Sequence, residues 1–192
     1  MSSLISSSKY NNINDNKSLL EKKFSDRLSR IRLVITDVDG VLTDGGMYYT
    51  SKGDTMKRFH VLDGMGVNML RRREIPTIII TKEKNSTIRK WSTKMRVTRI
   101  YDGIIKKEEM LETICNEFKV KPEEVAFIGD DINDLGLLSK VGLAASPNNA
   151  RKYVKEKCHY VCENNGGHGA FRELADMILS QKFNTKNWEN YY

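Results

Sequence analysis

The 192-residue sequence has few cysteines and no long apolar run. Its cysteines, Cys115, Cys158 and Cys162, are odd in number and lack the spacing of a disulfide framework, which favours a reducing, cytoplasmic location. No stretch approaches the roughly 18 apolar residues that cross a membrane. The first 30 residues also lack the apolar core of a secretory signal, so we expect neither secretion nor a membrane partner.

Signatures of nucleic-acid binding are missing as well, since the sequence contains no zinc-finger spacing and no arginine-rich recognition segment. Charge is plentiful, with a formal net value of +7. A basic surface can attract nucleic acid or anionic metabolites, but an evenly solvated lysine-rich surface is the simpler interpretation. We therefore expect no nucleic-acid partner. A protein that only binds anions remains a rival hypothesis, and it would show salt-sensitive binding without turnover.

The chain is long enough for one domain with a substantial core. Residues 1–16 are rich in serine and asparagine and are interpreted as a disordered tail. An amphipathic pattern predicts a leading helix over residues 17–30. The main domain is expected at residues 31–182, followed by a short tail at 183–192.

Apolar, strand-like runs alternate with helical patterns through the main domain. The three strongest runs are 32–37, 77–81 and 124–130. Strands that are continuously apolar and separated by helices indicate a parallel sheet covered on both faces. The sequence therefore predicts an α/β, doubly wound fold.

A β-hairpin is predicted directly after the first strand. Runs at 46–50 and 56–61 are joined by the turn "SKGD" at 51–54. On this interpretation His60 alternates with apolar neighbours along the second strand of the hairpin.

Carboxylates gather where two of the predicted strands end. Asp37 and Asp39 follow the first run, and Asp130, Asp131 and Asp134 follow the third. Because the carboxyl ends of parallel strands meet at one edge of a sheet, these charges would repel one another unless a cation neutralised them. Mg²⁺ prefers such oxygen ligands. The alternative is a set of solvated helix caps, and it stays open for Asp131 and Asp134.

Two further groups could complete a phosphate site at the same edge. Thr81 supplies a hydroxyl at a strand end, and Lys106 or Lys107 supplies an ammonium at the start of a helix. A metal held by carboxylates can neutralise phosphate oxygens. One carboxylate could attack phosphorus to form an aspartyl phosphate, while a second exchanges protons with the leaving alcohol and with water.

Four motifs, taken in order, resemble those of the haloacid dehalogenase superfamily of phosphohydrolases. They are "DVDGVLTD", "IIIT", Lys107 and "GDDINDL", and the resemblance covers about residues 30–181. A receiver domain of signalling proteins also has an acidic Mg²⁺ pocket, but it does not account for the DxDG spacing or for the hairpin.

The resemblance implies a role for each matching residue. Asp37 would be the nucleophile and Asp39 the general acid and base. Mg²⁺ would be held by the Asp37 side chain, the Asp39 backbone carbonyl and the Asp130 side chain. Thr81 and Lys107 would bind phosphate, with Lys107 preferred to Lys106 because its distance to "GDD" fits the family better. Asp131 and Asp134 would shape the surroundings of the metal.

Only about 18 residues separate Asp44 from Asp63, which leaves room for a hairpin and none for a cap domain. The stretches "GDTMKRFHVLDGMG" and "GGHGAFRELADMIL" resemble the 3-deoxy-D-manno-octulosonate 8-phosphate (KDO 8-phosphate) phosphatase subfamily. Its relatives act on sialic-acid-type 9-phosphates or are fused to acylneuraminate cytidylyltransferases. The resemblance implies a homotetramer joined by hairpins, in which a neighbour covers each site. It also implies that His60, Asp63 and Gly64 face a sugar acid.

Four positions depart from this subfamily. Asn68, Glu83 and Trp91 stand where KDO 8-phosphate relatives carry arginines, and His168 replaces the arginine of "GGRGA". A guanidinium fork binds carboxylates in a way that glutamate cannot. The identity of the sugar acid therefore stays open, although other arginines could compensate: Arg58, Arg72 or Arg172. His168 is interpreted either as a substrate contact or as a plain loop residue, and Trp91 as a packing residue.

The sequence thus predicts a Mg²⁺-dependent, capless phosphatase for the phosphate ester of a 3-deoxy-2-ulosonic acid. One rival is a phosphatase of another small metabolite. A second is a degenerate oligomerisation module of a cytidylyltransferase, some relatives of which have lost their catalytic carboxylates. The presence of Asp37, Asp39, Lys107 and Asp130 argues against that loss.

Overall fold

The structure is a computed structural model that describes residues 18–183. The predicted tail at residues 1–16, and all but the first residue of the predicted tail at 183–192, lie outside the described residues. Residues 18–30 are helical and lead into the first strand of the sheet. Among the described residues, no helix combines the length and the apolar character needed to span a bilayer.

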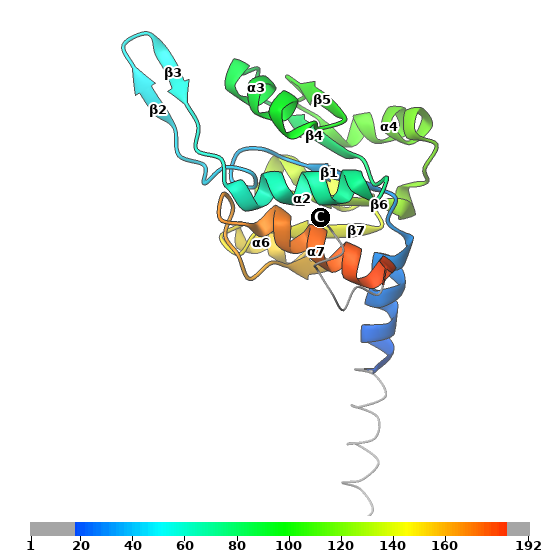
Figure 1. Ribbon diagram of the computed structural model, residues 1–192. Helices are drawn as coiled ribbons and strands as arrows, with labels where there is room; N and C mark the ends of the chain where they lie inside the picture. Colours follow the sequence, from blue (N-terminus) through cyan, green and yellow to red (C-terminus); the bar gives the residue numbers. More distant parts are fainter. Residues whose placement is uncertain (1–17, 184–192) are drawn as a thin grey trace, which may run out of the picture.

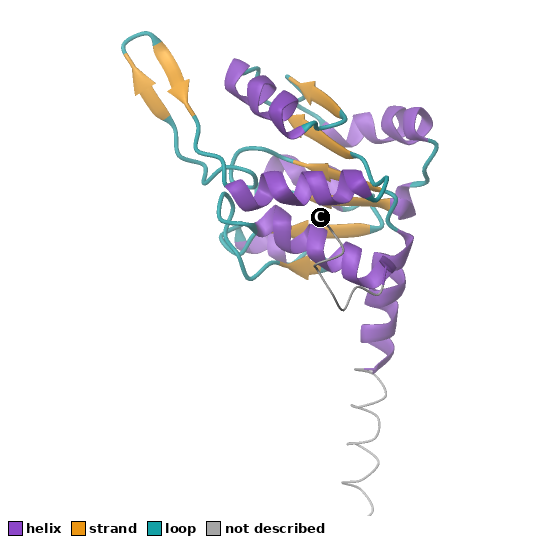
Figure 2. Cartoon of the chain, in the orientation of Figure 1, coloured by secondary structure: helices purple, strands orange, loops and turns teal. Residues whose placement is uncertain are grey.

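A six-stranded sheet forms the centre of the molecule (Figures 1 and 2). Its strands are β1 (Leu33–Thr36), β4 (Thr77–Thr81), β5 (Arg99–Asp102), β6 (Val125–Ile128), β7 (Leu143–Ser146) and β8 (Tyr160–Val161). They lie in the order β5-β4-β1-β6-β7-β8, and every neighbouring pair is parallel. The predicted doubly wound α/β fold is confirmed, with β1 and β6 side by side at its centre.

Helices cover the two faces of this sheet. They are α2 (Val61–Arg72), α3 (Ser86–Met95), α4 (Leu111–Phe118), α5 (Leu135–Leu138), α6 (Lys152–Lys155) and α7 (Ala170–Phe183). Three 3₁₀ turns interrupt the connections: η1 (Lys107–Met110), η2 (Pro122–Glu124) and η3 (Ile132–Asp134). The helix expected to start at Lys106 or Lys107 thus begins with the 3₁₀ turn η1, whose first residue is Lys107, and continues as α4.

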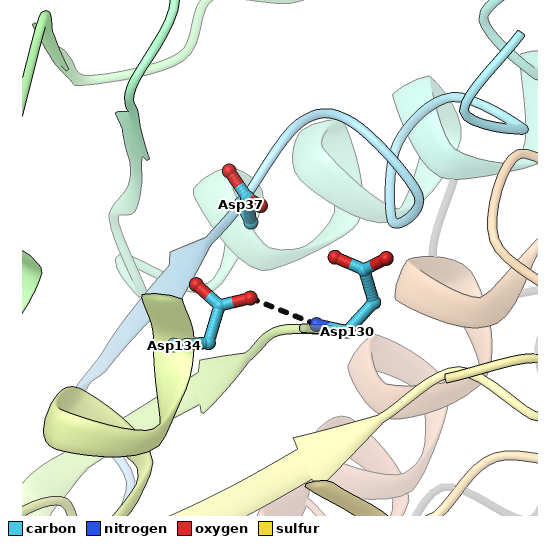
Figure 3. A group of neighbouring side chains, drawn as sticks. All are labelled: Asp37, Asp130 and Asp134. Carbon is cyan, nitrogen blue, oxygen red and sulfur yellow. Dashed lines mark hydrogen bonds between the residues drawn. The ribbon is translucent and has the colours of Figure 1, made fainter. Parts of the chain in front are cut away.

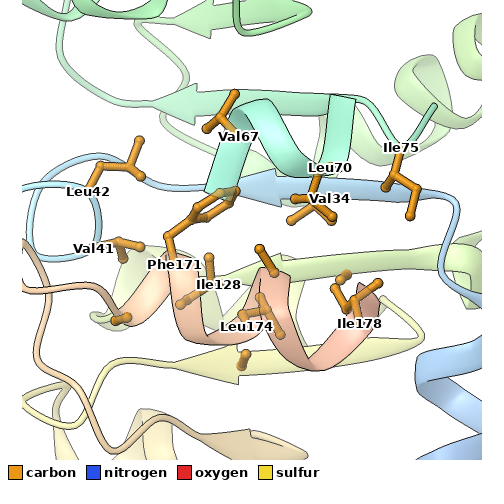
Figure 4. Close-up of a cluster of buried hydrophobic side chains, with 14 of the residues drawn as sticks. Val34, Val41, Leu42, Val67, Leu70, Ile75, Ile128, Phe171, Leu174 and Ile178 are labelled. Carbon is orange, nitrogen blue, oxygen red and sulfur yellow. The ribbon is translucent and has the colours of Figure 1, made fainter. Parts of the chain in front are cut away.

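Alternate residues of each strand point to opposite faces, which explains why the strands are apolar throughout. Val34 of β1 packs with Leu70 of α2 and Leu174 of α7 on one face (Figure 4). Leu33 and Ile35 pack on the other face, in the cluster that holds α4 and α5. Both clusters are almost free of solvent contact, so the carboxyl ends of the strands are held rigidly.

The hairpin insertion consists of β2 (Tyr48–Thr50) and β3 (Gly53–Met56), and it projects away from the domain (Figure 1). Its predicted second strand, 56–61, was wrong: β3 ends at Met56, and His60 is the N-cap of α2. The apolar alternation there reflects packing on the domain. Phe59 stacks on Trp91 with ring centroids 4.7 Å apart, and it pairs with Thr43 in an isolated bridge.

Candidate active site

Three carboxylates meet at the carboxyl edge of the sheet (Figure 3). Asp37 follows β1, Asp130 follows β6, and Asp134 closes η3. One oxygen of each lies within 4.8 Å of the others. Side-by-side parallel strands thus bring together residues that are far apart in the sequence, as the motif spacing predicts.

Gly40 allows this approach. Its φ of +83° lies in the left-handed region, and a Cβ atom built on it would stand 2.1 Å from Asp130 Oδ2. A side chain here would be both strained and in collision with the cluster. The glycine of the DxDG motif therefore permits the loop after β1 to pass close to Asp130.

Lys107 is the cation of the cluster. Its side chain is fully buried, and its Nζ lies 2.8 Å from Asp37 Oδ1 and 2.7 Å from Asp134 Oδ1. One ammonium therefore faces three carboxylates, so negative charge is in excess. Lys106 points elsewhere: its side chain is 67% exposed and pairs with Glu109. The structure thus separates the two lysines between which the residue types alone did not choose.

The excess of negative charge is reflected in two raised pKa values. Burial raises the pKa of Asp37 to about 7, although the neighbouring Lys107 opposes the rise. Burial, followed by the charge of Asp37, raises the pKa of Asp130 to about 7. In residues 18–183 the Asp130 carboxylate finds no ion-pair partner. A divalent cation would relieve both groups.

Asp134 and Asp131 have different surroundings. Asp134 is fully buried, and its Oδ2 accepts hydrogen bonds from the backbone N–H groups of Asp130 and Asp131, at 2.9 and 3.2 Å. Asp134 therefore fixes the loop that carries Asp130. Asp131 caps η3 through the N–H of Ile132 and also accepts a hydrogen bond from the Tyr153 hydroxyl.

The donor set fits a hard divalent cation, because every candidate ligand is a carboxylate or carbonyl oxygen and the local charge is negative. The side chain of Asp39 stands apart from this set. Its Oδ1 accepts hydrogen bonds from Lys57 Nζ at 2.8 Å and from the Thr43 hydroxyl at 3.3 Å. Lys57 Nζ also lies 2.8 Å from Glu83 Oε2.

Lys57 was missed by the sequence analysis. It sits in the run interpreted as a hairpin strand, where alternate residues are expected to face solvent, yet its side chain is only 1% exposed. No periodicity marks a buried lysine of this kind. The only available signal was its place within the family-like stretch "GDTMKRFHVLDGMG".

The cluster opens into a pocket of about 330 Å³. The pocket is lined by Asp37, Asp39, Thr81, Lys82, Glu83, Asp130, Asp131, Ile132 and Asn133. Thr81 stands at the end of β4, and its hydroxyl oxygen accepts a hydrogen bond from the N–H of Glu83. The pocket therefore contains the predicted nucleophile, the predicted acid and base, and the predicted phosphate hydroxyl.

The segment from His60 to Gly64 does not line this pocket, because it forms the start of α2. Asp63 is fully buried, and its Oδ1 accepts a hydrogen bond from the N–H of Arg172 at the start of α7. A Cβ atom at Gly64 would stand 2.4 Å from Met95 Sδ. Asp63 and Gly64 thus contact other parts of the chain, and their contact with a sugar acid stays a prediction.

The remaining candidates lie around the base of the hairpin. Arg58 Nη1 is 3.3 Å from Asp44 Oδ2, 3.2 Å from the carbonyl oxygen of Gly167 and 3.3 Å from His168 Nε2. The rings of His60 and His168 are 6.2 Å apart. Arg58 therefore ties the loop that carries His168 to the hairpin.

Three further residues singled out in the sequence form contacts within the chain. Asn68 donates a hydrogen bond to the backbone of Gly64, and Trp91 packs on Phe59. Arg172 pairs with Asp176.

Comparisons with known proteins agree with this geometry. The model of the haloacid dehalogenase-like hydrolase family matches residues 72–174, more than half of the chain. The KDO 8-phosphate phosphatase of Haemophilus influenzae is 37% identical over 153 residues, which cover 80% of this chain and 85% of that protein.

Solved structures are similar as well. The KDO 8-phosphate phosphatase of Yersinia pestis superimposes with a TM-score of 0.81 at 34% identity, covering 83% of this chain and 86% of that one. The enzyme of Moraxella catarrhalis, solved with a magnesium ion, a phosphate ion and KDO, has a TM-score of 0.81 at 29% identity, with coverage of 84% and 92%.

Proposed function

Because this chain belongs to the haloacid dehalogenase-like hydrolases and is a Mg²⁺-dependent phosphatase, we propose that it hydrolyses KDO 8-phosphate at the cluster of Asp37, Asp130 and Asp134. The observation that carries the proposal is the buried Lys107 beneath three carboxylates at the mouth of an open pocket. A buried cluster of carboxylates that repel one another is typical of a functional site.

Asp37 is the nucleophile in this proposal, and Asp39 is the general acid and base. A carboxylate oxygen of Asp37 attacks phosphorus while the bond from phosphorus to the sugar oxygen breaks. The leaving oxygen keeps the bonding electrons and takes a proton from Asp39. Asp39 then removes a proton from water, whose oxygen attacks the aspartyl phosphate and releases phosphate together with the Asp37 carboxylate.

The other site residues position these two. Lys107 orients Asp37 and contributes positive charge near the phosphoryl group, and Thr81 offers its hydroxyl to a phosphate oxygen. Mg²⁺ would be held by the carboxylates of Asp37 and Asp130 and by the backbone carbonyl of Asp39. Bound there, it supplies neutralisation of phosphate charge. Asp134 keeps Asp130 in place through the backbone.

A second substrate has one observation in its favour. Glu83 lines the pocket and pairs with Lys57, so that part of the wall carries a carboxylate. An acidic wall suits the hydroxyl groups of a sugar better than its carboxylate. The 9-phosphate of a sialic-acid-type sugar, a larger 3-deoxy-2-ulosonic acid, is therefore the second candidate.

The same proposal includes a homotetramer in the cytoplasm. Apolar side chains stand exposed on the hairpin, among them Met47, Tyr48, Tyr49 and Met56. Such a patch on an arm that projects from the domain is typical of a contact surface between subunits. The three cysteines are all free, as in a reducing compartment.

Phosphate release with Mg²⁺, with and without EDTA, tests the activity. The substrates are KDO 8-phosphate, a sialic acid 9-phosphate and p-nitrophenyl phosphate. We expect turnover that requires metal and disappears in Asp37→Asn but not in the surface variant Asp26→Asn. The sugar phosphate with the highest kcat/KM identifies the substrate. A well-folded protein that is inactive on the whole panel would contradict the proposal.

A further inference from the structure

Lys57 joins three loops at the carboxyl edge of the sheet. It follows the hairpin strand β3, whereas Asp39 follows β1 and Glu83 follows β4. Its Nζ lies 2.8 Å from Asp39 Oδ1 and 2.8 Å from Glu83 Oε2. The two carboxylates line the pocket, but the lysine itself does not. The hairpin therefore reaches the reaction site through one buried ammonium.

The geometry of Asp39 depends on this contact. Its Oδ1 accepts a hydrogen bond from Lys57 at 2.8 Å, and the Thr43 hydroxyl, whose single proton is shared with the carbonyl oxygen of Val38, lies 3.3 Å from the same Oδ1. Asp39 also lines the pocket, so these contacts hold a carboxylate that a substrate in the pocket could reach. The Asp39 side chain remains 33% exposed, so without the lysine it has room to turn into solvent.

We propose that Lys57 is a positioning residue that holds Asp39 for proton transfer to the leaving alcohol, and that Glu83 anchors Lys57 in turn. This inference rests on the role given to Asp39 under the proposed function. Glu83 holds the same ammonium from the loop after β4, so the location of Lys57 does not depend on Asp39 alone.

The inference also gives Glu83 a role that an arginine at this position could not fill. A guanidinium beside the Lys57 ammonium would repel it, whereas the Glu83 carboxylate holds it 2.8 Å away.

Substrates whose leaving groups differ in basicity can show whether Lys57 positions Asp39 for proton transfer or has only a structural role. An alkoxide leaving from a sugar phosphate needs a proton, whereas p-nitrophenolate leaves without one. The quantity to compare is kcat/KM, because it reports steps up to release of the alcohol and excludes hydrolysis of the aspartyl phosphate. The variants are Lys57→Met, Glu83→Gln and Asp39→Asn, with the exposed Lys152→Met as the matched control.

For Lys57→Met we expect kcat/KM on the sugar phosphate to fall about 100-fold, as for a misplaced catalytic group, and kcat/KM on p-nitrophenyl phosphate to stay within about threefold. Glu83→Gln should show the same selectivity with a smaller loss. The double variant Lys57→Met, Asp39→Asn should have a kcat/KM on the sugar phosphate only slightly below that of Asp39→Asn alone, because Lys57 acts through Asp39. Lys152→Met should match the wild type on both substrates.

Equal losses on both substrates would overturn the inference and assign Lys57 a structural role. So would additive losses in the double variant. If Lys57→Met does not fold, the same comparison in Glu83→Gln decides, because that variant keeps the pair of Lys57 and Asp39. A wild type without Mg²⁺-dependent turnover would instead contradict the proposed function, so the two failures are distinguishable.

Discussion

Lys107 Nζ lies 2.8 Å from Asp37 Oδ1, and both side chains are buried. The neighbouring Lys106 is exposed and pairs with Glu109. Two adjacent lysines thus have opposite surroundings, one beneath the carboxylate cluster and one on the surface, because the 3₁₀ turn η1 directs consecutive side chains to different sides.

Replacement of Lys107 should have a large effect, and replacement of Lys106 a small one. Lys107→Met leaves Asp37 and Asp134 unpaired in a buried site, so we expect kcat to fall at least about 100-fold, together with a loss of several kcal/mol in the free energy of unfolding. Lys106→Met removes only an exposed pair and should change both quantities little. Steady-state phosphate release and urea unfolding of the two variants measure this. Equal activities would contradict the assignment of Lys107.

Magnesium affinity should rise with pH near neutrality. Without a cation, the pKa values of Asp37 and Asp130 are both raised to about 7. Below pH 7, protons therefore compete with Mg²⁺ for these two carboxylates. At pH values well above 7 this competition disappears. We expect the apparent Kd for Mg²⁺ to fall at least about tenfold between pH 6 and pH 8.

Calorimetry in buffers of different ionisation enthalpy measures the protons released on Mg²⁺ binding. The wild type should release protons at pH 7, and Asp37→Asn should release fewer. An affinity and a proton count that do not change with pH would show that the cluster is already ionised without metal.

The sequence predicted the fold and the core of this site for a clear physical reason. Buried parallel strands are continuously apolar, and the polar residues at their ends are conspicuous, so β1, β4 and β6 and the groups that follow them could be located. The hairpin strand could not be placed, because Phe59 satisfies the same alternation by stacking on Trp91. Lys57 could not be found either, because its burial depends on two loops far away in the sequence.

Asp63 should make stability depend on pH. Burial raises its pKa to about 6 from the ordinary 3.8. Between pH 3.8 and pH 6 the unfolded chain loses the Asp63 proton while the folded chain keeps it. The contribution of the neutral carboxyl group to stability is therefore complete below pH 3.8 and is lost as pH rises through 6. The loss amounts to about 3 kcal/mol in the free energy of unfolding.

Asp63→Asn keeps an oxygen that can accept from the N–H of Arg172 but removes the ionisation. Urea unfolding at fixed protein concentration between pH 4 and pH 7 compares the two proteins. The wild type should lose stability relative to the variant as pH rises. Parallel curves would show that the Asp63 carboxylate ionises in the folded protein as it does in water.

Alanine variants at Gly40 and Gly53 distinguish the effect of backbone strain from that of a collision with the carboxylate cluster. Both have positive φ, +83° and +110°, so an alanine is strained at either position. A Cβ atom added at Gly40 would collide with Asp130 Oδ2, whereas a Cβ atom added at Gly53 would have no other atom within 4 Å. Gly40→Ala must therefore displace Asp130 or the loop after β1, and Gly53→Ala need not disturb the site.

We expect both variants to lose about 1 kcal/mol or more in the free energy of unfolding from strain. Only Gly40→Ala should also weaken Mg²⁺ binding and lower kcat/KM, each at least about tenfold, because a ligand is moved. Thermal shifts with and without saturating Mg²⁺ give the comparison, since metal bound to the folded state raises Tm. If Gly40→Ala gains as much in Tm from Mg²⁺ as Gly53→Ala does, then Asp130 is not a ligand, and the metal is held by other members of the cluster.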